Sequence, residues 1–271
     1  MGNGRAIINM KKEDLSRLKK WFTGYVASYY TGDREYDRPI RLKEDHTARV
    51  CENILLLGQS LDLSEPELIL LEVIGLFHDI GRFEQYKRHG TFVDSASEDH
   101  ARLGIRQLAR HSVLSFCRLA ERRHIARAIA YHNAAVLPER VDEESLIYMR
   151  LIRDADKLDV WRVLIDYYRV RDQRPSPALE LGVPDDPSCS PEMIDALYTR
   201  RSALLKDVRN VNDAVLLQIS WVFDLNFPPS IDMVRDRQYV RQLRAFLPQT
   251  EAVQTAVDQV ESYLSGVSST S

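Results

Sequence analysis

The stretch SEPELILLEVIGLFHDIGR, residues 64–82, begins with a helix-start signal and carries an adjacent His78–Asp79 pair near its end. Ser64 is a typical N-cap residue, and Gly81 favours the C-terminal end of the same helix. The apolar run between them must be buried. A histidine and an aspartate at its end are costly to bury unless they bind a metal or pair with each other in a helix-capping hydrogen bond.

Hydrophobic residues recur at helical spacing in almost every other periodic segment, and no convincing strand alternation is seen. Ser95 and Glu98 have the spacing of a capping box at the start of one of these helices. The expected helices cover about 15–29, 43–61, 64–81, 95–110, 116–133, 143–170, 191–224, 233–247 and 251–264. The sequence therefore predicts an all-α fold.

Two segments are expected to be irregular: a polar loop at residues 82–94 and a proline-rich loop at residues 174–191. The second loop is expected to separate a helical core, residues 1–173, from a C-terminal helical extension, residues 192–271, packed on that core. Its length favours a lid or a partner surface.

Composition limits the class of protein. The chain has 271 residues, 44% of them hydrophobic, and its net charge of -3 argues against bulk nucleic-acid binding. A small anionic substrate remains compatible with that charge, because local clusters matter more than the total. Three cysteines without CxxC spacing predict reduced thiols. The N-terminal MGNGRAIINM lacks an apolar signal core, and the longest apolar run, around 68–77, is too short to span a bilayer. We therefore expect a cytoplasmic protein without a membrane partner, in which a homo-oligomer is an open alternative.

Imidazole and carboxylate side chains recur on separate helical segments before and after the His–Asp pair. The six candidates are His46, His78, Asp79, His100, His132 and Asp156. These are the ligand types that Mn, Fe, Co and Zn take up in proteins. If they converge in one helical core, they would form a site for one or two metal ions, which can activate water at neutral pH.

The order His, His-Asp, His, His, Asp resembles the HD-domain superfamily of metal-dependent phosphohydrolases, over about residues 40–165. The strings HDIGR, AIAYH and DADKLD are the specific parts of this resemblance. It implies an HD-type helical bundle, followed here by additional C-terminal helices, and two divalent ions drawn from Fe, Mn, Co, Ni or Zn. It also implies two ligand sets that share one bridging carboxylate: His46, His78, Asp79 and Asp156 for the first metal, and Asp79, His100 and His132 for the second.

A phosphate substrate requires positive charge near the metals. Arg82 lies three positions after the bridging Asp79, and Lys157 adjoins the last carboxylate of the set, so both are expected at the phosphate. Asp99 or Asp159 could orient the attacking water. The expected function is hydrolysis of a nucleotide or another small phosphate ester through a metal-activated water, with a small phosphorylated molecule as the partner.

Two alternatives stay open. Some relatives with the same six ligands are diiron oxygenases that cleave C–C or C–P bonds, and the ligand set does not separate the two chemistries. A non-catalytic module that senses a nucleotide is the other alternative. The remaining histidines, His89, His111 and His124, are interpreted as surface or partly buried residues outside the metal site.

Overall fold

A computed structural model of the chain describes residues 8–174, 179–180 and 182–267, and these residues contain helices but no strand. The predicted all-α fold is thus confirmed. Pro175 and Pro177 of the expected proline-rich loop lie outside the described residues. Within the described part, none of the helices combines the length and the apolar character needed to cross a bilayer.

The chain forms two compact units, Met1–Asp156 and Lys157–Ser271. The boundary falls inside one long helix, α7 (Glu143–Tyr168), which contributes residues to both units. The division expected from the sequence, at the proline-rich loop, stays a prediction.

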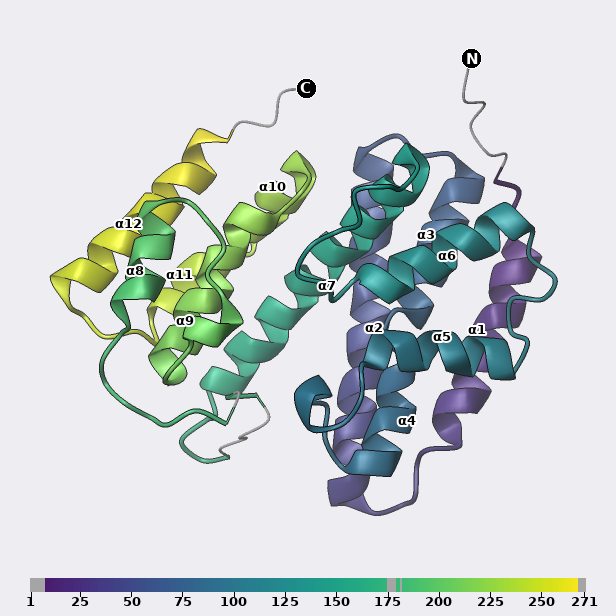
Figure 1. The fold of residues 1–271 in the computed structure, drawn as a ribbon, viewed down its shortest axis with the longest axis horizontal. Coiled ribbons are helices and arrows are strands. Elements are labelled where there is room, and N and C mark those ends of the chain that lie inside the picture. Colours follow the sequence, from purple (N-terminus) through teal and green to yellow (C-terminus); the bar gives the residue numbers. More distant parts are fainter. Residues whose placement is uncertain (1–7, 175–178, 181, 268–271) are drawn as a thin grey trace. The chain divides into compact units, whose positions relative to one another are not determined.

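The first unit is a bundle of helices in which neighbouring elements pack in pairs (Figure 1). Its elements are α1 (Lys12–Ala27), α2 (Arg34–Ser60), α3 (Glu65–Phe77), α4 (Ile80–His89), the short 3-10 helix η1 (Asp94–Ala96), α5 (His100–Arg110), α6 (Leu119–Tyr131) and the first part of α7. Helix α2 packs along α3, α4 packs against α5, and α3 also contacts α1 and α6. Fully buried side chains such as Ile54, Phe77 and Phe83 form its core.

Polar side chains set the starts of α2 and α3. The Asp33 carboxylate accepts hydrogen bonds from two backbone N–H groups in the first turn of α2, so this helix starts earlier than the sequence indicated. At α3, the Glu67 carboxylate accepts from the backbone N–H of Ser64 at 2.9 Å. The predicted start of this helix at Ser64 is confirmed.

The start of α5 differs from the expectation. The helix begins at His100 and not near Ser95, because the Asp99 carboxylate caps it by accepting from the backbone N–H of Arg102 at 2.9 Å. Ser95 instead lies in η1. The true cap thus places His100 in the first turn of α5.

The helix that leads to the His–Asp pair does not end at Gly81, and the predicted loop at 82–94 begins as a helix. Helix α3 ends at Phe77, the backbone turns at Asp79 with φ -104° and ψ 15°, and α4 follows at once. Gly81 has a packing role, because a Cβ atom there would lie 2.1 Å from the carbonyl oxygen of His100. The missing side chain allows the backbones of α4 and α5 to touch, which brings His100 up to the pair.

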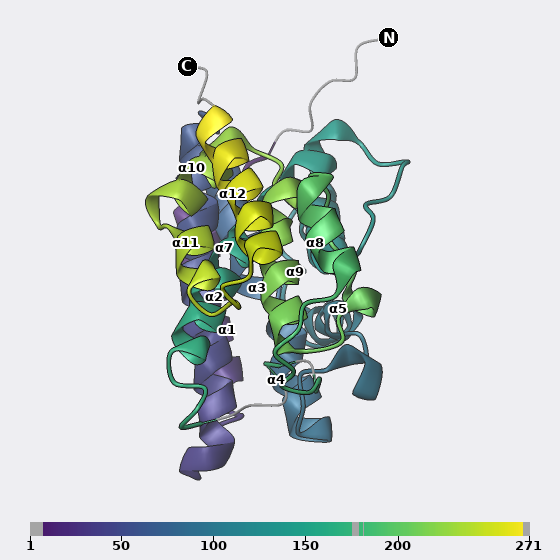
Figure 2. The ribbon, with the colours of Figure 1, turned by 90° about the vertical axis from the view of Figure 1, so that its left-hand side faces the viewer.

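The second unit contains the rest of α7 and a set of shorter helices. These are α8 (Pro191–Tyr198), η2 (Leu205–Asp207), α9 (Val211–Ser220), η3 (Trp221–Asp224), α10 (Pro228–Asp236), α11 (Tyr239–Arg244) and α12 (Glu251–Gly266). Helices α8, α9 and α12 pack on one another (Figure 2). Trp161 of α7 is fully buried in this unit, and its indole N–H donates to the carbonyl of Gln218 at 2.9 Å.

The long helices expected at 191–224 and 233–247 are interrupted. Asn210 caps α9 by accepting from the backbone N–H of Asp213, so a new helix starts there. Gln238 has φ 54°, a left-handed conformation that separates α10 from α11. Hydrophobic periodicity alone does not reveal such breaks.

Candidate metal centre

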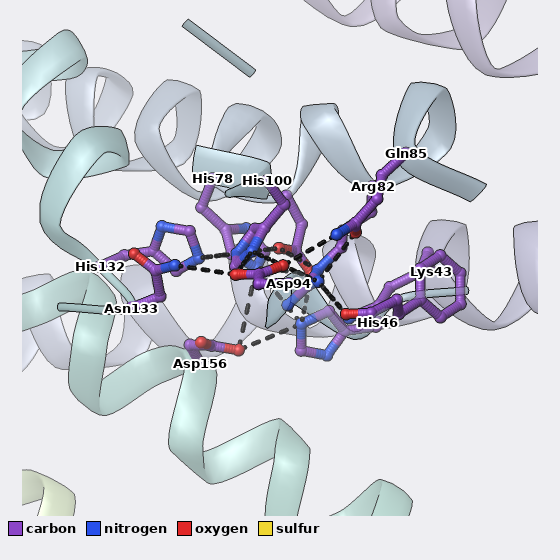
Figure 3. A network of polar contacts seen from close by, with 12 residues as sticks. Lys43, His46, His78, Arg82, Gln85, Asp94, His100, His132, Asn133 and Asp156 are labelled. Carbon is purple, nitrogen blue, oxygen red and sulfur yellow. Dashed lines mark hydrogen bonds and ion pairs between the residues drawn. The ribbon is translucent and has the colours of Figure 1, made fainter. Parts of the chain in front are cut away.

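The six residues singled out from the sequence meet inside the first unit (Figure 3). They form two groups whose potential ligand atoms lie within 4.8 Å of one another: His46, His78 and Asp156, and Asp79, His100 and His132. The four histidines and Asp79 are buried, while the Asp156 side chain keeps 23% of its surface exposed. The site is therefore closed on most sides and accessible beside Asp156.

Most of these side chains lie at the ends of helices. His78 follows the last residue of α3, Asp79 lies at the turn into α4, His100 opens α5, and His132 follows the last residue of α6. His46 comes from the middle of α2 and Asp156 from α7. Several short helix ends can thus converge on one point between two longer helices.

Hydrogen bonds on the far side of the rings fix the tautomers of three histidines. Nδ1 of His78 and Nδ1 of His132 each lie 2.7 Å from a backbone carbonyl three residues earlier. Nδ1 of His100 lies 2.7 Å from a carboxylate oxygen of Asp94. Since all three partners only accept, each Nδ1 carries the proton and each Nε2 of the neutral ring keeps its lone pair.

The Nε2 atoms of the four histidines lie in two close pairs. Nε2 of His100 lies 3.0 Å from Nε2 of His132, and Nε2 of His78 lies 3.3 Å from Nε2 of His46. Oδ1 of Asp79 is buried, finds no hydrogen-bond partner among the described residues, and lies 3.3 Å from Nε2 of His100. Lone pairs at such distances repel unless a cation lies among them, so the donor set fits a divalent metal ion.

Asp79 lies between the two groups. Its Oδ1 faces His100 and His132, while its Oδ2 lies 3.7 Å from Nε2 of His46 and also 3.7 Å from Nε2 of His78. One carboxylate oxygen directed at each group is what a bridging ligand requires.

Burial controls the charges at this site. It lowers the pKa of His78 to about 4 and lowers the pKa of His100, so both rings are neutral at pH 7. Burial alone would raise the pKa of Asp79, but the ammonium of Lys43, 2.7 Å from Oδ2, helps to hold that pKa well below its usual range. Neutral imidazoles and an ionised carboxylate can bind a metal without first losing protons.

A second layer of polar side chains surrounds Asp94, behind His100. Oδ1 of Asp94 accepts from Nη1 of Arg82 and from Nε2 of Gln85, both at 2.9 Å, and Nδ2 of Asn133 lies 3.4 Å from Oδ2. Burial would raise the pKa of Asp94, but the hydrogen bond from His100 and the Arg82 charge lower it to about 2. Asp94 is therefore a carboxylate at neutral pH.

Arg82, expected at the substrate phosphate, lies beside the centre and is already engaged. Its Nη1 donates to Asp94, to Gln85 and to the Phe92 carbonyl, and its Nε lies 3.5 Å from Oδ1 of Asp79. A role at the phosphate stays a prediction for this residue.

Lys157 and Asp159 follow Asp156 on α7 and belong to the second unit. Nζ of Lys157 forms an ion pair with Asp224 at 2.7 Å, and Oδ1 of Asp159 lies 3.9 Å from Nη1 of Arg162. Their expected roles, at the phosphate and at the attacking water, stay predictions.

The sequence analysis missed Lys43 and Asp94. Lys43 lies three residues before His46, so both are on one face of α2, and this helical spacing could have revealed it. Asp94 lies in an irregular segment before His100, where no periodicity indicates direction. Asp99, which the sequence placed near the attacking water, caps α5.

His124, expected from the sequence to be a surface or partly buried residue outside the metal site, lies apart from both groups but is fully buried, so the expected exposure was wrong. Its Nδ1 pairs with the hydroxyl of Ser145 at 2.8 Å. Together with Asp142 and Glu144 it forms a third group of potential ligands. However, Asp142 accepts from the backbone N–H of Ser145 at the start of α7 and pairs with Arg127, which gives this group a structural role.

A comparison with known protein families supports the assignment of the six residues to a metal centre. Residues 44–161 match the family model described as HD domain, a range that includes all six residues of the centre. This part of the chain is therefore an HD domain, and the resemblance stated from the sequence is confirmed. The HD domain and the buried His/Asp groups together indicate metal-dependent, hydrolase-type activity in general. No curated protein and no solved structure matched the chain.

Proposed function

We propose that the protein is a divalent-metal-dependent phosphohydrolase that acts on a nucleotide or another small phosphate ester. The observation that carries the proposal is the orientation of the donor atoms: buried imidazole Nε2 atoms face one another on both sides of the Asp79 carboxylate. Such a donor set is matched to a pair of cations, here two of Fe, Mn, Co, Ni or Zn, and a phosphoryl group carries the negative charge that such a pair attracts.

The residues divide into two sets by position. His46, His78 and Asp156 would hold one ion, His100 and His132 would hold the other, and Asp79 would bridge them. When bound, two such ions polarise the phosphoryl oxygens and activate water as the nucleophile. Asp79 would keep the two ions together, and burial of His78 and His100 would keep their Nε2 atoms unprotonated for binding.

Lys43 is the cation that fits the phosphate best. Its Nζ lies 2.7 Å from Oδ2 of Asp79 and 5.5 Å from the centre of the Phe92 ring, and its side chain is 17% exposed. Beside this carboxylate, the ammonium would be placed to donate to a phosphoryl oxygen of the substrate. Arg82 would add positive charge on the Oδ1 side of the same carboxylate.

A reconstitution screen tests the proposal. Metal-free protein is loaded separately with Mn, Fe, Co, Ni or Zn and assayed for phosphate release from nucleotides, phosphomonoesters and phosphodiesters. We expect turnover that requires a metal, and loss of both turnover and bound metal in Asp79→Ala. Full activity in metal-free Asp79→Ala protein would contradict the proposal. Iron-dependent oxygen consumption on a diol or phosphonate, without hydrolysis of any ester, would favour the oxygenase chemistry instead.

A further inference from the structure

The two halves of the centre orient their histidines by different means. His78 and His132 follow the last residues of α3 and α6, so the Nδ1 of each reaches a carbonyl of its own helix. His100 opens α5 and has no turn of that helix before it to supply such a carbonyl. Its Nδ1 is held instead by the Asp94 carboxylate, at 2.7 Å from Oδ2 and 3.0 Å from Oδ1.

Asp94 itself is held by α4. Nη1 of Arg82 and Nε2 of Gln85, one helical turn apart, both donate to its Oδ1. Gln85 is fully buried, and its Nε2 also lies 2.8 Å from Oγ of Ser97 and 2.9 Å from the carbonyl of Glu98. These hydrogen bonds hold the segment between α4 and α5 against α4. Figure 3 shows these side chains reaching the carboxylate from the side away from Asp156.

We infer that Asp94 is a positioning residue for one half of the centre: through His100, it sets the affinity of the Asp79–His100–His132 group for its metal ion. The inference rests on the proposed metal centre. A carboxylate bonded to the far nitrogen of a ligating imidazole fixes the ring and makes Nε2 a stronger donor. In the other group, Nδ1 of His78 is held by the carbonyl of Gly75 and not by Asp94, so the two halves should respond differently to its loss.

The test measures metal binding and not turnover. Full-length Asp94→Asn protein is titrated with Co²⁺ by calorimetry, and bound metal is counted by elemental analysis after buffer exchange. Removing such an outer carboxylate typically weakens metal binding about ten- to a hundredfold. We expect two sites in the wild-type chain, and in Asp94→Asn one unchanged site and one weakened by about that factor. Asp94→Glu, which keeps the charge, should bind the second ion more tightly than Asp94→Asn.

Glu98→Gln is the matched control. It removes the same charge from the same segment, but Glu98 pairs with Arg88 and Arg106 at the surface and should leave both metal sites intact. Equal binding curves for Asp94→Asn and Glu98→Gln would overturn the inference, as would equal weakening of both sites in Asp94→Asn. Wild-type protein with fewer than two sites would instead contradict the proposed centre.

The variant is expected to fold, because the Asp94 side chain is 32% exposed and lies at the start of the short helix η1. If Asp94→Asn does not fold, Asp94→Ser removes the same carboxylate from His100. The same two outcomes decide the inference for this variant: metal binding is weakened at the Asp79–His100–His132 group alone, or it is not.

Discussion

The ammonium of Lys43 lies 2.7 Å from the same Asp79 oxygen that would bind a metal ion. In the proposed centre, a lysine beside this carboxylate would neutralise it in the metal-free protein and would lie close to the phosphate of a bound substrate. At the residue scale the sequence predicted six candidate ligands that the fold does bring together, because their types and order along the chain are distinctive. It did not predict Lys43 or Asp94, which support the ligands and belong to no such pattern.

Lys43→Met should lower catalytic efficiency toward phosphate esters without loss of metal. A charge-assisted hydrogen bond contributes about 1.5–3 kcal/mol, which corresponds to about a ten- to hundredfold fall in kcat/KM. The measurement is steady-state kinetics of metal-loaded protein, with metal content determined in parallel. Lys87→Met, at an exposed position on α4, is the control. Unchanged kinetics in Lys43→Met, with both ions bound, would remove Lys43 from the phosphate site.

At the scale of elements, the turn between α3 and α4 and the contact between α4 and α5 place His78, Asp79 and His100. The sequence predicted the start of α3 correctly, since Ser64 and Glu67 are local signals. It placed the helix end at Gly81 because a glycine commonly ends a helix. Close approach to another helix is a second reason for a glycine, and only the tertiary structure reveals it.

Gly81→Ala should destabilise the protein and weaken binding of the second metal ion. The new Cβ would lie 2.1 Å from the His100 carbonyl and 2.6 Å from the Gly104 nitrogen, and no side-chain rotation can relieve contacts with backbone atoms. Overpacking of this kind costs about 1–3 kcal/mol, and the shift needed to relieve it moves His100.

Urea unfolding and metal titration measure both effects of Gly81→Ala. The control is Gly24→Ala in α1, where an added Cβ meets nothing within 4 Å. This control should be neutral or slightly stabilising, by up to about 1 kcal/mol. Gly81→Ala protein with wild-type stability and two tight metal sites would show that the contact between α4 and α5 is not required.

At the scale of the whole molecule, the centre makes the metal-free protein sensitive to acid. His78 titrates near 6.5 when exposed, and burial lowers its pKa to about 4 in the folded chain. Between these values the unfolded chain binds a proton that the folded chain does not, so stability rises with pH. The contribution of His78 is complete above about pH 6.5 and is lost as the pH falls toward about 4.

Lowering the pH from about 7 to about 5 should therefore reduce the unfolding free energy of the metal-free protein by about 2 kcal/mol. Urea unfolding at the two pH values measures the change. His78→Asn, which has no titrating ring at this position, should show a smaller loss. A stability that does not change, or that increases, over this range would contradict the buried, neutral state of His78.

Anomalous diffraction from crystals grown with Mn²⁺ or Co²⁺ tests the two-metal centre most directly. We expect two peaks about 3.5–4 Å apart, the usual separation in two-metal sites. One peak should lie beside Nε2 of His46 and His78, the other beside Nε2 of His100 and His132, with Asp79 between them. A single peak with His100 and His132 turned away from it, or no peak at all, would contradict this account.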